Sequence, residues 1–258
     1  MSGCDRVGFR RLTVFLGALV LLIGSGTGWA GARCVLNMGW EPYQYQEDSH
    51  LTGFDIELMR LAATDMGCEL KLHQRPWQRG IHEARVGVQD LVAGASMTEE
   101  RQRWFYYSAP YRTETMALFV MKGTSDLYSF SQLRDIVDSQ FRLGINRGVY
   151  YGKAFEKARQ ELIDNGRLSV YNTEQQKYKM FMSGRIDGFL GGQASIKALV
   201  KNYLDDVEIY PLKITTSDQY ILFSKVSTTP GQVARFNQSL AKLKRSGAYQ
   251  KLVERFLQ

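Results

Sequence analysis

Metal-binding residue types are scarce in this chain of 258 residues, which contains three cysteines and three histidines. His50, His73 and His82 show no ligand spacing, and Cys34 and Cys68 are far from any Cys-x-x-Cys pattern. A zinc site needs several such ligands at short, fixed separations. We therefore predict no metal site and assign the histidines to surface or packing positions.

Nucleotide-binding and nucleophile motifs are also missing. The segment 148–153 reads GVYYGK, one residue short of a P-loop and without its Ser or Thr, and no strand–GxGxxG–helix fingerprint occurs. No G-x-S-x-G elbow nominates a serine nucleophile. The formal net charge of +7 is not gathered into a basic stripe. We predict no cofactor, no catalytic residue and no nucleic-acid partner.

The N-terminal apolar run is too short to span a membrane. Leu12 to Ile23 has twelve residues, whereas a spanning helix needs roughly 20. Three arginines precede this run, and small residues follow it up to an A-x-A site formed by Ala30 and Ala32. This order is typical of a secretory signal peptide. We predict that residues 1–32 are cleaved on export to the periplasm; a retained anchor is the weaker alternative.

Two cysteines remain after the predicted cleavage. Cys34 opens one predicted strand and Cys68 opens the next, with one helix between them. Adjacent parallel strands bring such starts together, and the periplasm is oxidising. We predict a Cys34–Cys68 disulfide, with two buried thiols as the alternative.

Strand-like and helix-like segments alternate through the rest of the chain, which is typical of α/β folds with a mainly parallel sheet. Two long apolar strands, at 115–121 and 220–223, flank a second alternating block. The pattern predicts two lobes joined by two crossings, with residues 33–117 and 219–258 in the first lobe and 118–218 in the second. We expect strands at 34–38, 69–73, 91–95, 143–146, 169–171 and 188–190, and helices at 54–66, at 78–86 and after Thr229.

One segment carries the chemistry of a binding site. Small residues at 93–96 end a predicted strand, and Thr98 is a predicted helix N-cap that places Arg101 one turn into the helix. Ligands bind at such strand ends in α/β sheets, and an arginine grips a carboxylate with two parallel hydrogen bonds. The alternative is a surface ion pair of Arg101 with Glu99 or another acid.

Five motifs follow one another along the chain. They are GFDIEL at 53–58, AGASMTEER at 93–101, YSAPY at 107–111, SGRID at 183–187 and SGAY at 246–249, the last expected within the final helix. With these motifs in this order, the chain resembles the extracellular solute-binding proteins of polar amino-acid ABC transporters over nearly all of its length after the predicted signal. The resemblance implies a type II periplasmic-binding fold, in which two α/β lobes close around the ligand.

Matching positions in the family imply ligand contacts in the first lobe. Arg101 would hold the ligand carboxylate, while Gly94 and Ser96 would offer a carbonyl and a hydroxyl to an α-ammonium group. Three further residues would complete this side: Trp40 and Trp77 as aromatic walls, for which core packing is the alternative, and Asn37 as a side-chain contact.

The second lobe departs from the family pattern. Arg147, Gly148 and Tyr150 match a carboxylate-binding loop, but Val149 stands where relatives have a threonine hydroxyl. Gly192 stands where relatives have an aspartate for the ligand ammonium. An unpaired buried ammonium is costly. Either the ligand lacks an ammonium group, or another acid replaces the aspartate, the candidates being Glu41, Glu114 and Glu174.

Three functions remain open at this stage. The first is a monomeric binding protein that delivers a small carboxylate-bearing solute, such as an amino acid, to an inner-membrane ABC permease. The second is an enzyme, since the fold resembles that of periplasmic cyclohexadienyl dehydratases, with Glu174 as the general acid. The third is a sensor that docks to a receptor. We favour the first and predict that the protein is not an enzyme.

Overall fold

The computed structural model describes Met1 and residues 34–40, 46–47, 50–200 and 206–257. The predicted signal peptide at 1–32 therefore lies outside the described residues, Met1 apart. Within the described ranges, no helix is long and apolar enough to cross a membrane.

The first lobe is built on parallel strands. β1 (Val35–Trp40) pairs in parallel with β4 (Glu69–Gln74) and with β5 (Leu91–Ala95). Helices α1 (Phe54–Asp65) and α2 (Trp77–Arg85) connect these strands. The predicted disulfide between Cys34 and Cys68 is confirmed and joins the starts of β1 and β4.

The second lobe repeats this arrangement. β8 (Leu143–Asn146) pairs in parallel with β9 (Leu168–Tyr171) and with β10 (Gly188–Gly192). The helices of this lobe are α4 (Leu133–Asp138), α5 (Lys153–Asp164), α6 (Glu174–Met182) and α7 (Gln193–Val200), after a short 3-10 turn η1 (Ser125–Leu127).

Two long strands, which we call the connecting strands, run between the lobes. β7 (Arg112–Met121) and β11 (Val207–Ser224) pair antiparallel with each other. β11 also pairs antiparallel with β5 and with β6 (Phe105–Tyr107), and β7 pairs antiparallel with β10. The sheet is therefore mixed: parallel away from the connecting strands and antiparallel along them. Its order is β4-β1-β5-β11-β7-β10-β8-β9.

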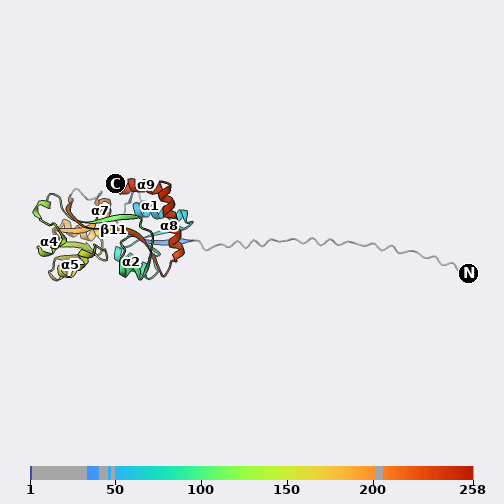
Figure 1. Cartoon of the computed structure of the whole chain (residues 1–258), viewed down its shortest axis with the longest axis horizontal. Helices are drawn as coiled ribbons and strands as arrows, with labels where there is room; N and C mark the ends of the chain where they lie inside the picture. The colour runs from blue at the N-terminus through green and yellow to red at the C-terminus, as the bar shows by residue number, and fades with distance from the viewer. Residues whose placement is uncertain (2–33, 41–45, 48–49, 201–205, 258) are drawn as a thin grey trace. The chain divides into compact units, whose positions relative to one another are not determined.

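The connecting strands are longer than the sequence predicts. β7 begins three residues before 115, and β11 begins well before 220. The sequence did not indicate the extra length of β11, because polar residues such as Lys213 and Asp218 interrupt its apolar pattern, although its backbone pairs with β7 there. Figure 1 shows α1, α2, α8 and α9 on one side of β11 and α4, α5 and α7 on the other. The exact lobe boundaries at 117/118 and 218/219 remain predictions.

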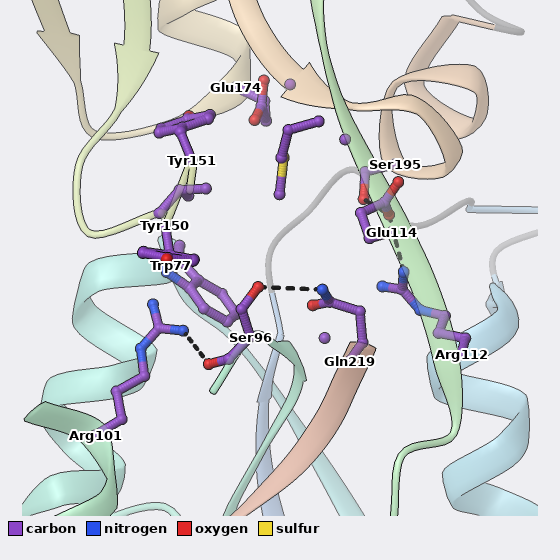
Figure 2. A pocket seen from close by; sticks show the side chains of 15 residues that line it. Trp77, Ser96, Arg101, Arg112, Glu114, Tyr150, Tyr151, Glu174, Ser195 and Gln219 are labelled. Atoms are coloured by element: carbon purple, nitrogen blue, oxygen red, sulfur yellow. Dashed lines mark hydrogen bonds and ion pairs between the residues drawn. The ribbon is translucent and has the colours of Figure 1, made fainter. Parts of the chain in front are cut away.

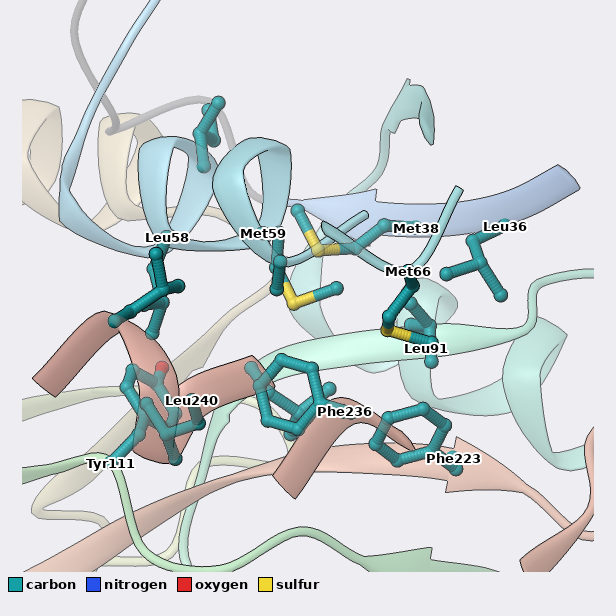
Figure 3. Close-up of a cluster of buried hydrophobic side chains, with 14 of the residues drawn as sticks. Leu36, Met38, Leu58, Met59, Met66, Leu91, Tyr111, Phe223, Phe236 and Leu240 are labelled. Atoms are coloured by element: carbon teal, nitrogen blue, oxygen red, sulfur yellow. The ribbon is translucent and has the colours of Figure 1, made fainter. Parts of the chain in front are cut away.

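Each lobe has its own hydrophobic core. In the first lobe, Met38 on β1, Met59 on α1 and Phe236 pack together and are fully buried (Figure 3). In the second lobe, Leu143, Phe155 and other residues form a separate cluster. Burying each such side chain contributes about 1.5–3 kcal/mol. Each lobe is thus held together by its own buried side chains, and Val149 of the second lobe also packs against a first-lobe cluster that contains Trp77.

The C-terminal helices return to the first lobe. α8 (Pro230–Arg245) begins at the predicted N-cap Thr229, which forms a capping box with Gln232. The prediction that the SGAY motif lies within the final helix is wrong. Gly247 adopts a left-handed conformation (φ 77°), which separates α8 from a second helix, α9 (Ala248–Phe256). Two short elements complete the chain: α3 (Glu99–Gln102) and the hairpin of β2 (Gln46–Glu47) and β3 (His50–Leu51).

Candidate functional site

A pocket lies between the two lobes, where β5 and β10 end against the connecting strands (Figure 2). Its free volume is about 50 Å³, which is room for a few water molecules. Strand ends of α/β sheets leave backbone groups accessible, so this is a natural place for a ligand. The pocket is lined by Trp77, Gly94, Ser96, Arg101, Arg112, Glu114, Met116, Val149, Tyr150, Tyr151, Glu174, Gly191, Gly192, Ser195 and Gln219.

Arg101 is a buried cation held by carbonyl groups. Thr98 caps α3 by accepting a hydrogen bond from the Arg101 backbone N–H, and this fixes where the side chain begins. Its Nη1 donates to the carbonyl of Ser96 (2.8 Å) and its Nη2 to the carbonyl of Gly148 (2.9 Å). Arg101 forms no ion pair within the part of the chain that the structure describes. Burial, the largest effect on it, lowers the pKa of this guanidinium.

Gly148 connects the second lobe to the first. Its carbonyl accepts hydrogen bonds from Arg101 and from the indole Nε1 of Trp77 (3.0 Å). Its φ of +75° belongs to the left-handed region, and a Cβ added to it would lie 1.8 Å from Oε1 of Gln78. The left-handed φ favours glycine here, and a larger residue would also have to push aside the side chain of Gln78 at the start of α2. One carbonyl oxygen thus fills the space in front of both first-lobe donors.

Ser96 belongs to a polar chain on the floor of the pocket. Its hydroxyl lies 3.1 Å from the hydroxyl of Ser217 and accepts a hydrogen bond from Nε2 of Gln219 (3.1 Å). Gly94 lies two residues earlier on β5. A Cβ there would approach Arg112 and Asp55 to 3.1 Å, so the glycine leaves room for that ion pair.

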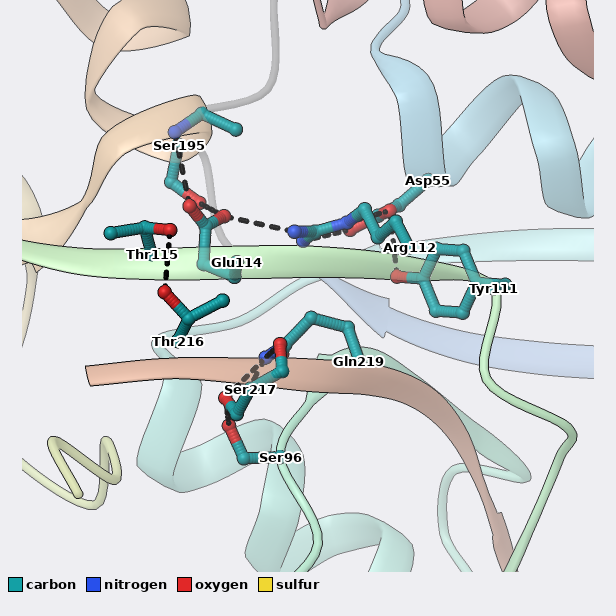
Figure 4. Close-up of polar contacts among 11 residues, drawn as sticks. Asp55, Ser96, Tyr111, Arg112, Glu114, Thr115, Ser195, Thr216, Ser217 and Gln219 are labelled. Atoms are coloured by element: carbon teal, nitrogen blue, oxygen red, sulfur yellow. Dashed lines mark hydrogen bonds and ion pairs between the residues drawn. The ribbon is translucent and has the colours of Figure 1, made fainter.

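A buried polar network, drawn in Figure 4, reaches the pocket through Arg112 and Glu114. Arg112 on β7 pairs with Asp55 of α1 (3.0 Å) and with Glu114 (2.8 Å). Tyr111 also donates its hydroxyl proton to Asp55 (2.7 Å). Burial disfavours a charged guanidinium, but Asp55, Tyr111 and Glu114 outweigh that effect and raise the pKa of Arg112 well above its ordinary value. Arg112 therefore stays charged.

Glu174 lies on the second-lobe side of the pocket and is held by a buried lysine. Lys177, which is fully buried, forms an ion pair with Glu174 (2.8 Å) and donates to the carbonyl of Leu190 (2.8 Å). The ammonium group of Lys177 also lies 4.9 Å from the ring centre of Phe189. A buried charge is tolerated only with such partners.

The structure brings seven of the ten predicted ligand-binding residues together around this pocket, Gly148 through its carbonyl. The residues are Gly94, Ser96, Trp77, Arg101, Gly148, Tyr150 and Gly192. Their role in ligand binding remains a prediction.

The other three predicted residues are not placed at the pocket. Asn37 on β1 is occupied by hydrogen bonds with Asp90 and His73. Arg147 is exposed and donates to Asn172 instead. Trp40 is placed only as the last residue of β1, and its side chain lies outside the description, as does the whole of Glu41.

Among the lining residues that the sequence analysis did not consider as ligand contacts are Arg112, Met116, Ser195 and Gln219. The sequence offered a signal for Arg112, whereas the positions of Gln219 and Ser195 follow from the folded sheet. Arg112 directly follows the YSAPY motif, and Arg112 and Glu114 are two residues apart on a strand, so they share one face. Gln219 pairs with Arg112 across the connecting strands. Ser195 follows Gly192 by one helical turn, which only the fold reveals.

No group of three or more His, Cys, Asp or Glu residues in the described ranges is arranged to hold a metal ion. The pocket itself offers two guanidinium groups, those of Arg101 and Arg112, together with the carboxylates of Glu114 and Glu174 and backbone groups. These suit the binding of a small polar solute.

Comparisons with known proteins identify relatives of this chain. The arginine-binding periplasmic protein of Mannheimia haemolytica is 21% identical over 251 residues, which cover 95% of this chain and 97% of that protein. The substrate-binding protein AbpA of Streptococcus pneumoniae, from an amino acid ABC transporter and solved with L-arginine, is 26% identical with a TM-score of 0.72, and the match covers 85% of this chain and 93% of AbpA.

A third relative shares the fold. The ancestral amino-acid-binding protein AncCDT-1, a precursor of cyclohexadienyl dehydratase, is 21% identical with a TM-score of 0.71 and matches 87% of this chain and 96% of its own. The two-lobed α/β fold is thus confirmed. Residues 32–258 match the family model, which covers every motif of the predicted resemblance. The chain belongs to the bacterial extracellular solute-binding proteins, family 3.

Proposed function

We propose that this protein is the periplasmic substrate-binding component of an ABC transporter and binds a small carboxylate-bearing solute, an amino acid or a related acid, between its lobes. The observation that carries the proposal is the buried guanidinium of Arg101, which donates to two carbonyl oxygens and has no ion-pair partner among the described residues. A ligand carboxylate supplies the negative charge that this site lacks and can accept two parallel hydrogen bonds.

The mechanism needs only differential binding. In the closed arrangement the carbonyl of Gly148 takes one hydrogen bond from Arg101 and one from Trp77. The free volume of about 50 Å³ requires the lobes to separate before a solute enters. A carboxylate then replaces the Gly148 carbonyl in front of Arg101, and the lobes close over it. The ligand shifts the population toward the closed state because it contacts both lobes there.

The expected partner is an inner-membrane ABC permease, and the predicted signal peptide at 1–32 would direct the chain to the periplasm. Family membership and the named amino-acid binders support this assignment. Expression of the full chain in Escherichia coli should yield a periplasmic protein whose N-terminus, read by sequencing, follows Ala32. An intact N-terminus in the membrane fraction would contradict export by a cleaved signal.

We propose no enzymatic activity for the protein. Glu174 is the acid that a dehydratase mechanism would use, and it forms an ion pair with the buried Lys177. The contact with Lys177 occupies a carboxylate oxygen of Glu174 that a dehydratase would direct at its substrate. Incubation with prephenate should give no product; measurable turnover would replace the transport assignment with an enzymatic one.

The binding site is tested by comparing two arginines of the same short segment. Wild-type protein is screened by thermal shift against amino acids, dicarboxylates, amines and cyclohexadienyl acids, since a ligand raises the melting temperature by mass action. Arg101→Ala should abolish the shift. Arg103→Ala is the matched control, because Arg103 is exposed, and it should keep the shift. If the ligand raised the melting temperature of Arg101→Ala as much as that of wild type, the proposed carboxylate site would be wrong.

A further inference from the structure

Gly192 and Glu114 compete for one volume at the end of β10. A Cβ added to Gly192 would lie 2.7 Å from Cδ of Glu114 and 3.0 Å from its Oε1. Contacts this short cannot be accommodated without movement. The carboxylate of Glu114, from the connecting strand β7, therefore occupies the place into which a side chain at position 192 would extend. The carboxylate of Glu114 can take this position only because residue 192 has no side chain.

The carboxylate of Glu114 is held by three hydrogen bonds and can accept one more. Its oxygens accept hydrogen bonds from Arg112 (2.8 Å), from the backbone N–H of Ala194 (3.0 Å) and from the hydroxyl of Ser195 (3.3 Å). A carboxylate offers about four acceptor positions. One position thus remains, and Glu114 lines the pocket, although its residue as a whole is only 4% exposed.

Glu114 shares its cationic partner with a second carboxylate. Arg112 forms ion pairs with both Asp55 and Glu114, and its side chain is 8% exposed. On the opposite side of the same pocket, Arg101 has a positive charge without an ion-pair partner in the described part of the chain. Figure 2 shows Arg101 and Glu114 on either side of the cavity. A ligand with a carboxylate at one end and a cation at the other would give each of these two groups a partner of opposite charge, as buried charges require.

We infer that Glu114 binds the cationic group of the ligand, in place of an acid at position 192, and that the ligand is a zwitterion, an α-amino acid rather than a simple carboxylic acid. This inference rests on the proposed function and names its substrate class. The ligand carboxylate lies against Arg101 and its ammonium against Glu114. Glu114 is on a strand that runs between the lobes. Its carboxylate is oriented by Arg112, on the same strand, and by the first turn of α7, in the second lobe.

The inference predicts that an acid at position 192 can replace the acid at position 114. Glu114→Gln keeps the shape of the side chain and removes its charge, so the affinity for the tightest of the twenty standard L-amino acids should fall roughly 30- to 1,000-fold, as for other truncated buried charge pairs. Glu114→Ala should bind as weakly. The double variant Glu114→Ala with Gly192→Asp should regain most of the affinity, because removing the Glu114 side chain frees the volume beside position 192.

The readout is the preference, within each variant, for the amino acid over its 2-hydroxy analogue, measured by isothermal titration calorimetry. This ratio does not depend on the fraction of protein that is folded. Wild type and the double variant should prefer the amino acid strongly, and Glu114→Gln should lose the preference. Equal binding of both ligands by wild type, or an unchanged preference in Glu114→Gln, overturns the inference while the carboxylate site stands. Failure of wild type to bind either class overturns the proposed function itself.

Discussion

Removing the Cys34–Cys68 disulfide should cost a measurable share of the stability of the first lobe. The bond closes a loop with a sequence separation of 34 residues and joins the starts of β1 and β4, where the N–H of Glu69 also donates to the carbonyl of Cys34. The loop-closure relation gives about 3.8 kcal/mol at 25 °C for a loop of this length. In a domain of this size that corresponds to a fall in melting temperature of roughly 8–15 °C.

The assay is urea denaturation of wild type and of Cys34→Ser with Cys68→Ser. The double variant should lose about 3.8 kcal/mol of unfolding free energy, and reducing wild type with dithiothreitol should reproduce that loss. Dithiothreitol should have no effect on the double variant, which serves as the control. A denaturation midpoint that is the same in oxidised wild type, reduced wild type and the double variant would refute the reasoning.

Two further predictions concern the contact between the lobes and the response to acid. Gly148→Ala should weaken ligand binding roughly tenfold by calorimetry, because its Cβ would displace the side chain of Gln78 when the lobes close. Gly166→Ala, at a similar φ of +66° but with nothing within 4 Å, should only destabilise the fold; equal affinities for the two variants would contradict this. Burial works against the charged form of Glu83, but hydrogen bonds from Arg79, Gln89 and Arg75 outweigh it and hold its pKa at about 2, below its ordinary 4.5. A lowered pKa stabilises the fold above pH 4.5, so the stability advantage of wild type over Glu83→Gln should shrink as the pH falls from 4.5 to 2, and an advantage that does not change over this range would contradict the assignment.

The fold followed from the sequence wherever local patterns were strong. The strands at 91–95 and 143–146 and the capped start of α8 were predicted to the residue, because apolar runs, N-cap chemistry and Pro230 act locally. The full length of β11 was not predicted, since its polar middle, residues 213–219, is a strand only through its pairing with β7. The break at Gly247 was missed because a left-handed residue leaves helical hydrophobic spacing intact on both sides.

The candidate site was predictable in its first lobe and less so in its second. Arg101 could be placed because its N-cap, its strand end and its helix are adjacent in sequence. Glu114 was one of three candidate acids, and sequence spacing could not choose among them. Its selection depends on Gly192, some 80 residues later, and on the pairing of β10 with β7, in which Gly192 lies opposite Met116. Long-range pairing of this kind is a property of the folded sheet.

The most direct test of the account is a crystal structure of the protein with the tightest-binding amino acid from the screen. We predict that the ligand carboxylate accepts two hydrogen bonds from the guanidinium of Arg101 and that the carbonyl of Gly148, which now occupies that position at 2.9 Å, has moved away. A complex in which Arg101 still donates to Gly148 while the ligand binds elsewhere would contradict the central claim.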